Sequence, residues 1–154
     1  MRSIIAFLVC FSCLAPALAV PPTKSDATGP VAEVRDRWLV AFKSKNVEAA
    51  VDFYASDAVF LQPSGDRITG IDAIRELYRK VVDTFDTDLV LRSHNLEASN
   101  SLAYDSGEYE ETLTNRASGQ KQHFRGQYLM IFRFGADQHW KIIEHVWTVI
   151  PNPA

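Results

Sequence analysis

Four histidines and several carboxylates are the side chains of this sequence with the chemistry for proton transfer. An imidazole titrates near neutral pH, so it can act as a general base or as a hydrogen-bond partner of a ligand. His145 shares one face of an expected strand with Trp147, and His94 lies where polar and apolar residues alternate. Both histidines are candidate bases, and the alternative for each is a structural histidine held by its neighbours.

The acidic residues of segment 108–111 are divided between two faces of an expected strand. Glu108 and Glu110 lie on one face, and Tyr109 and Glu111 lie on the other. Most of these acids are expected at a solvated surface, and Glu108 is the one that we place in a pocket. A carboxyl group buried beside an imidazole has a coupled pKa and can form an acid/base pair with it. The catalytic residue therefore stays open among His145, His94 and Glu108.

The histidine spacing does not favour a metal site. No two of the histidines, which are His94, His123, His139 and His145, lie two or four positions apart. His139 and His145 share a strand face, but six residues separate them by about 20 Å. The sequence also lacks a Ser-His-Asp order and a phosphate-binding glycine loop. We therefore expect no metal and no cofactor.

The first 19 residues have the pattern of a secretory signal peptide. Arg2 precedes a short apolar run, which ends in the small-x-small cleavage signal Ala17-Leu18-Ala19. The run is shorter than the about 20 apolar residues of a membrane span. Cleavage after Ala19 removes both cysteines, so we expect a secreted or periplasmic protein that has no thiol and no membrane anchor. An uncleaved signal anchor is the alternative.

The composition of the full chain is that of one globular domain. Of the 154 residues, 47% are hydrophobic and 23% are charged, and the formal net charge is −3. This apolar content excludes a disordered chain, and the acidic balance argues against a nucleic-acid partner. Residues 20–29 are polar and contain prolines, so they form an expected flexible leader. The domain is expected over residues 30–150.

Helical periodicity comes first in the chain, and strand-like alternation follows it. Asn46 can cap a short second helix, and Thr69 and Asp72 have the spacing of a capping box for the third. Short loops between the later strands predict hairpins and an antiparallel sheet. The expected helices span 30–45, a short segment after Asn46, and 70–85; the expected strands span 57–63, 87–97, 102–113, 121–134 and 139–150.

This order of elements is typical of an α+β fold. Three helices must cover one face of a curved antiparallel sheet, with mixed strand pairing at one edge. A strongly bent sheet beneath helices leaves a conical cavity, and such concave apolar sites bind small ligands. Side chains expected in this pocket are those of Trp38, Tyr54, Phe60, Gln62, Tyr78, Tyr128, Met130 and Trp147.

Five short motifs occur in a characteristic order over about residues 30–150. Their order and spacing resemble those of the nuclear-transport-factor-2-like superfamily, and within it the SnoaL-like and ketosteroid-isomerase-like domains. The resemblance implies a cone-shaped, cystatin-like fold, commonly a homodimer, that serves both enzymes and binding proteins. The motifs are Trp38-Leu39-Val40-Ala41-Phe42, Tyr54 to Phe60 followed by Pro63-Ser64-Gly65, Gly70 to Ile74, Gly107-x-Tyr109, and Trp140 to Ile143.

Other residues occupy the positions of this group's catalytic bases. Ketosteroid isomerases have an aspartate base directly before a proline, at the position of Gln62, and an amide does not accept a proton near neutral pH. Their oxyanion-donating tyrosine corresponds to Trp38. The segment 141–147 is similar to a SnoaL cyclase motif, in which His145 matches the histidine and Trp147 replaces the acid/base aspartate. The resemblance thus implies that both bases are missing.

Three functions are compatible with these features. The first is an exported protein that binds a hydrophobic small molecule in an apolar pocket. The second is an isomerase, cyclase or hydrolase that acts on a hydrophobic substrate, with His145, His94 or Glu108 as its base. The third is a structural or interaction module, which predicts a large exposed apolar patch on the outer sheet face. A homodimer is compatible with all three.

Overall fold

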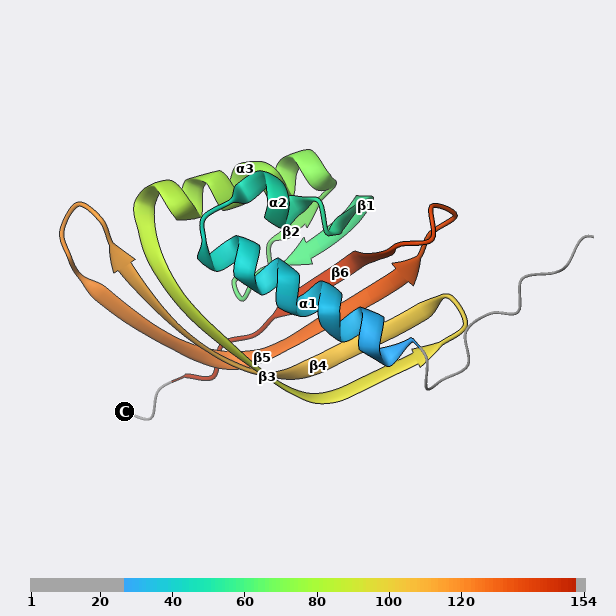
Figure 1. Ribbon diagram of the computed structural model, residues 1–154. Coiled ribbons are helices and arrows are strands. Elements are labelled where there is room, and N and C mark those ends of the chain that lie inside the picture. The colour runs from blue at the N-terminus through green and yellow to red at the C-terminus, as the bar shows by residue number, and fades with distance from the viewer. Residues whose placement is uncertain (1–26, 152–154) are drawn as a thin grey trace, which may run out of the picture.

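The computed structural model describes residues 27–151, in which three helices lie over one face of a curved six-stranded sheet (Figure 1). The predicted α+β class is confirmed, and the signal peptide predicted at residues 1–19 lies outside the described residues. None of the helices in the described range is long and apolar enough to cross a membrane. The helices are α1 (Thr28–Lys43), α2 (Val47–Val51) and α3 (Ile71–Thr84). The strands are β1 (Tyr54–Leu61), β2 (Arg67–Thr69), β3 (Phe85–Ser99), β4 (Leu102–Asn115), β5 (Lys121–Phe134) and β6 (Trp140–Trp147).

Local backbone chemistry sets the helix boundaries. The helix α1 ends before the predicted position 45, because Lys45 adopts a left-handed backbone with a φ of 60°. The Asn46 side chain caps α2 as predicted, by accepting a hydrogen bond of 3.1 Å from the Ala49 amide. The predicted capping box of α3 is wrong, because the cap position is Gly70, which has a φ of 90° and no side chain.

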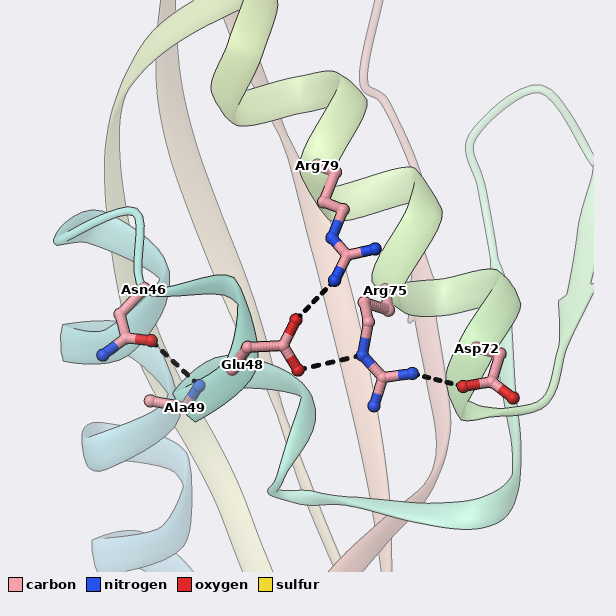
Figure 2. Close-up of polar contacts among 6 residues, drawn as sticks. All are labelled: Asn46, Glu48, Ala49, Asp72, Arg75 and Arg79. Carbon is pink, nitrogen blue, oxygen red and sulfur yellow. Dashed lines mark hydrogen bonds and ion pairs between the residues drawn. The ribbon is translucent and has the colours of Figure 1, made fainter.

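Charged side chains join α2 to α3, as Figure 2 shows. Glu48 of α2 accepts a hydrogen bond of 3.0 Å from Arg75 Nε and one of 2.7 Å from Arg79 Nη2. The two arginines are four positions apart on α3, so they reach the carboxylate from the same helix face. Asp72 pairs with Arg75 from the first turn of α3. Surface pairs of this kind contribute little to stability.

The strand order of the sheet is β2-β1-β6-β5-β4-β3. The three hairpins from β3 to β6 are antiparallel, as predicted from the short loops. On the other side of β6 lies β1, which runs parallel to it with Phe60 opposite His145, and β2 forms the edge beyond β1. The strand β2, which pairs with β1 over three residues, was not predicted, because so short a segment shows no alternation.

Close approaches and a bulge allow the long strands to curl around the helices (Figure 1). A Cβ atom on Gly107 of β4 would lie 2.0 Å from the carbonyl oxygen of Arg92, and one on Gly126 of β5 would lie 1.7 Å from that of Thr148. Only glycine therefore fits at these two positions. In β3 the pairing with β4 shifts around His94, which is the extra residue of a bulge. The sheet therefore presents a concave face to the helices.

A buried polar cluster anchors α1 on this concave face. Asp105 of β4 is fully buried, and Arg35 of α1 donates a hydrogen bond of 2.7 Å from Nη1 to its carboxylate. The hydroxyl group of Ser93 also donates to Asp105, and the Tyr128 hydroxyl lies 3.4 Å from it. This cluster fixes the distance between α1 and the sheet, and hence the width of the space beside it.

Candidate functional site

A cavity of about 290 Å³ lies between α1, α3 and the concave face of the sheet. Its wall is dominated by apolar side chains and includes seven aromatic residues. Among the predicted pocket residues, those that line it are Trp38, Phe60, Gln62, Tyr78 and Trp147. Further lining residues, which sequence reasoning did not single out for the pocket, include Phe42, Leu89, Tyr109, Glu111, Leu113 and Phe124.

The other three predicted pocket residues, Tyr54, Tyr128 and Met130, are buried outside the cavity wall. The expectation that their side chains reach the cavity is therefore wrong. The Tyr54 hydroxyl is hydrogen-bonded behind the wall, and the Tyr128 hydroxyl faces Asp105. Met130 pairs in register with His145 and is covered by the core. Aromatic and apolar residue types alone do not distinguish a cavity wall from the layer beneath it.

His145 is fully buried directly behind the cavity wall. Its ring is surrounded by the rings of Trp38, Phe60 and Trp147, with centroids 5.0, 5.2 and 4.9 Å away. Burial lowers the pKa of His145 to about 3, so the imidazole is neutral at physiological pH. Its Nε2 atom has no hydrogen-bond partner among the residues that the structure describes. A side chain in this position supports the wall and is a weak base.

A chain of three neutral groups runs from His145 to the cavity. The Tyr54 hydroxyl lies 2.6 Å from His145 Nδ1 and 2.6 Å from the Tyr78 hydroxyl. Burial raises the pKa of both tyrosines, so neither is ionised near neutral pH. With Nδ1 as the acceptor, Tyr54 donates to His145 and Tyr78 donates to Tyr54. The chain thus holds the Tyr78 ring in place where it lines the cavity.

The other two candidate bases, His94 and Glu108, are exposed and do not line the cavity. The bulge removes His94 from the alternation of β3, so its predicted inward orientation is wrong. Glu108 lies on the outer face of β4, opposite to the face of Tyr109. The expectation of Glu108 as a pocket carboxylate is therefore also wrong. Within residues 27–151, no group of three or more His, Cys, Asp or Glu side chains is arranged to hold a metal ion.

The carboxyl group that lines the cavity belongs to Glu111, three residues further along β4. It lies between Leu89 of β3 and Phe124 of β5 in the sheet register. Burial raises the pKa of Glu111. A hydrogen bond of 2.7 Å from the Thr87 hydroxyl lowers this pKa, but its effect is smaller than that of burial, so the pKa is raised overall. The sequence signal for this residue was the face that it shares with Tyr109.

A family model of the SnoaL-like domain matches residues 36–145 of the chain. No curated protein matches the chain. Several hundred solved structures match it, and those named below are under 25% identical to it, so they show the fold alone.

One similar structure is a ketosteroid isomerase-like protein from Erwinia carotovora atroseptica, with 23% identity and a TM-score of 0.75 over 82% of this chain and 98% of that one. A nuclear transport factor 2-like superfamily protein from Salmonella enterica has 18% identity and a TM-score of 0.75 over 84% and 95% of the two chains. A protein from Novosphingobium aromaticivorans, described as NTF2-like with a cystatin-like fold, has 14% identity and a TM-score of 0.66 over 82% and 83%.

Proposed function

Because the chain belongs to the SnoaL-like domain family, we propose that it binds a hydrophobic small molecule in the cavity beneath α1 and α3. The observation that carries this proposal is a cavity of about 290 Å³ whose wall is mostly aromatic and aliphatic. Ligand sites are typically concave and apolar, with a few polar groups that orient the ligand. Here those polar groups are Gln62, Tyr78 and Glu111.

The placement of the candidate bases favours binding over catalysis. Gln62 and Trp147 line the cavity, and neither side chain accepts a proton near neutral pH. The resemblance described above implies that they occupy the positions of the catalytic carboxylates of ketosteroid isomerases and SnoaL cyclases. His145 lies behind the wall with a lowered pKa, and His94 and Glu108 are exposed. An isomerase-type or dehydratase-type reaction in this cavity would need Glu111 as its base.

Direct binding of a neutral aromatic probe tests the proposed function. We expect 1-naphthalenemethanol to bind and to change the fluorescence of Trp38 and Trp147, which line the cavity. The substitution Leu113→Trp fills the cavity and is expected to weaken this binding at least tenfold. Val40→Trp, on an exposed position of α1, is the matched control. Equal binding by the two variants would contradict the proposal.

We further propose that the protein is exported and that cleavage follows Ala19. The support is the sequence of the first 19 residues, with its basic start, apolar run and cleavage signal. Expression of the full chain in a bacterial host with a signal peptidase, followed by intact mass measurement, tests this. A mature chain that begins at Val20 is the expected product, and a retained Met1 contradicts cleavage.

A further inference from the structure

The cavity has an unbalanced charge. Glu111 is the charged side chain of its wall, and no lysine, arginine or histidine lines the wall in the described part of the chain. The partner of its carboxyl group is the neutral hydroxyl of Thr87 at 2.7 Å, and no ion pair joins Glu111 to another residue of the range 27–151. Burying a carboxylate without a cation is unfavourable, so buried carboxylates are normally paired. The missing partner would be supplied by a cationic ligand.

The sheet partners of Glu111 and the titratable groups that interact with its charge are neutral, and His123 and Arg125 lie with it along a second pocket. In the sheet its neighbours are Leu89 and Phe124, and the titratable groups that interact with it are the hydroxyls of Tyr78 and Tyr109. Burial, together with the nearby Glu111 carboxylate, raises the pKa of Tyr109 to about 12, so this hydroxyl stays neutral. None of these groups competes with a ligand for the negative charge.

The rest of the wall is also suited to a cation. The faces of aromatic rings carry negative potential and attract ammonium groups, with tryptophan and tyrosine among the strongest. The rings of Trp147 and Tyr109 meet edge to face with centroids 4.5 Å apart, and both line the cavity with Trp38 and Tyr78. A cavity lined by aromatic rings and one carboxylate has the groups that bind an organic cation.

We propose that the cavity selects hydrophobic amines, with the ammonium group paired to Glu111 and the apolar body held among the aromatic rings. This inference rests on the proposed function, because it specifies the ligand class of the same cavity. A neutral ketone or alcohol would leave Glu111 uncompensated, and an anionic ligand would be repelled by it. Of these three kinds of ligand, the amine is the one that pairs with the charge of Glu111.

Three ligands of nearly equal shape test this proposal. They are 1-naphthylmethylamine, the neutral 1-naphthalenemethanol and the anionic 1-naphthoate, with binding measured by isothermal titration calorimetry at pH 7.5. We expect the amine to bind at least tenfold more tightly than the alcohol, and the carboxylate to bind most weakly. In Glu111→Gln the amine should lose this advantage and bind no more tightly than the alcohol binds to the same variant. Glu108→Gln, an exposed change on the same strand, is the matched control and should bind like wild type.

The outcomes separate the two proposals. If the alcohol binds as tightly as the amine to the wild-type protein, the amine inference is overturned and the proposed function stands. An amine preference that persists in a folded Glu111→Gln variant, as judged by circular dichroism, overturns the inference as well. If none of the three ligands binds to the folded wild-type protein, both proposals fail. The comparison of ligands on the wild-type protein does not depend on the folding of any variant.

Discussion

At the scale of single residues, the surroundings decide what His145 and Glu111 can do. His145 has the residue type of a base, but it is fully buried among aromatic rings and its pKa is lowered to about 3. Glu111 has the residue type of a surface acid, but it lies in the cavity wall and its pKa is raised. Desolvation disfavours the charged form in both cases, and it therefore moves the two pKa values in opposite directions.

The pH dependence of stability should reveal the burial of His145. Its pKa is about 3 in the folded state and about 6.5 when unfolded, so the unfolded chain binds more protons between these values. This histidine therefore lowers the free energy of unfolding as the pH falls from about 6.5 to about 3, by several kcal/mol in total. We expect His145→Leu to be less stable than wild type at pH 7.5, and the difference to shrink at pH 4.5 in thermal unfolding. His123→Gln, on an exposed histidine, is the control, and a difference that does not change with pH would contradict the assignment.

Glu111 should have the opposite pH signature. Its pKa is raised on folding, so the folded state binds more protons than the unfolded state at pH values between the two. The free energy of unfolding therefore falls as the pH rises through this window. Glu111→Gln is expected to have a higher melting temperature than wild type at pH 7.5, and a smaller gain at pH 4. Glu108→Gln should show little change at either pH, and a loss of stability in Glu111→Gln at pH 7.5 would refute the account.

At the scale of elements, the position of α1 depends on a few long-range contacts. Apolar residues such as Val31 and Phe42 pack one face of this helix against the core. The ion pair of Arg35 with the fully buried Asp105 then ties the helix to β4. Because Trp38 and Phe42 of α1 line the cavity, this anchor also determines the shape of the site.

Removing one partner of this buried ion pair should be costly. Asp105→Ala leaves the largely buried Arg35 guanidinium without its main partner, so we expect a loss of about 3–5 kcal/mol in the free energy of unfolding. Asp36→Ala removes the other acidic partner of Arg35, which is exposed, and is expected to cost less than about 1 kcal/mol. Urea unfolding of both variants gives the comparison. Similar losses in the two variants would show that the buried pair has no special role.

At the scale of the whole molecule, the two faces of the sheet have different surroundings. The concave face is covered by the helices (Figure 1). The cavity lies between this face and the helices α1 and α3. The outer face has apolar side chains that remain partly or fully exposed, namely those of Val90, Leu102, Tyr104, Leu129, Ile131 and Val146. Exposed apolar surface of this kind is typical of interfaces between chains.

We propose that two copies of the chain form a homodimer through this outer face. Light scattering coupled to size exclusion should give twice the chain mass for the wild-type protein. Ile131→Lys, in the middle of this face, should shift the mass toward that of one chain, because a lysine disfavours apolar contact. Val40→Lys on the exposed side of α1 is the control and should leave the dimer intact. A wild-type protein that stays monomeric at its highest soluble concentration would refute this prediction.

Much of the fold could be predicted because it is encoded in local patterns. The helical spacing within 70–85 and the short loops between the later strands identified α3 and the antiparallel hairpins. The cap at Asn46 was predictable for the same reason, since donor and acceptor lie three residues apart. The parallel pairing of β1 with β6 joins segments that are far apart in the sequence, and β2 has only three residues. Periodicity therefore carried little information about either feature.

The sequence by itself determined the element types, the likeness to a family and the two faces of β4, because each of these depends on residue order alone. Only the tertiary structure decided that the face of Glu111 points inward while that of Glu108 points to solvent. It also decided that His145 lies behind the wall. The physical reason is that strand alternation assigns residues to opposite faces, whereas the packing of α1 and α3 determines which face is covered and where the covering leaves a space.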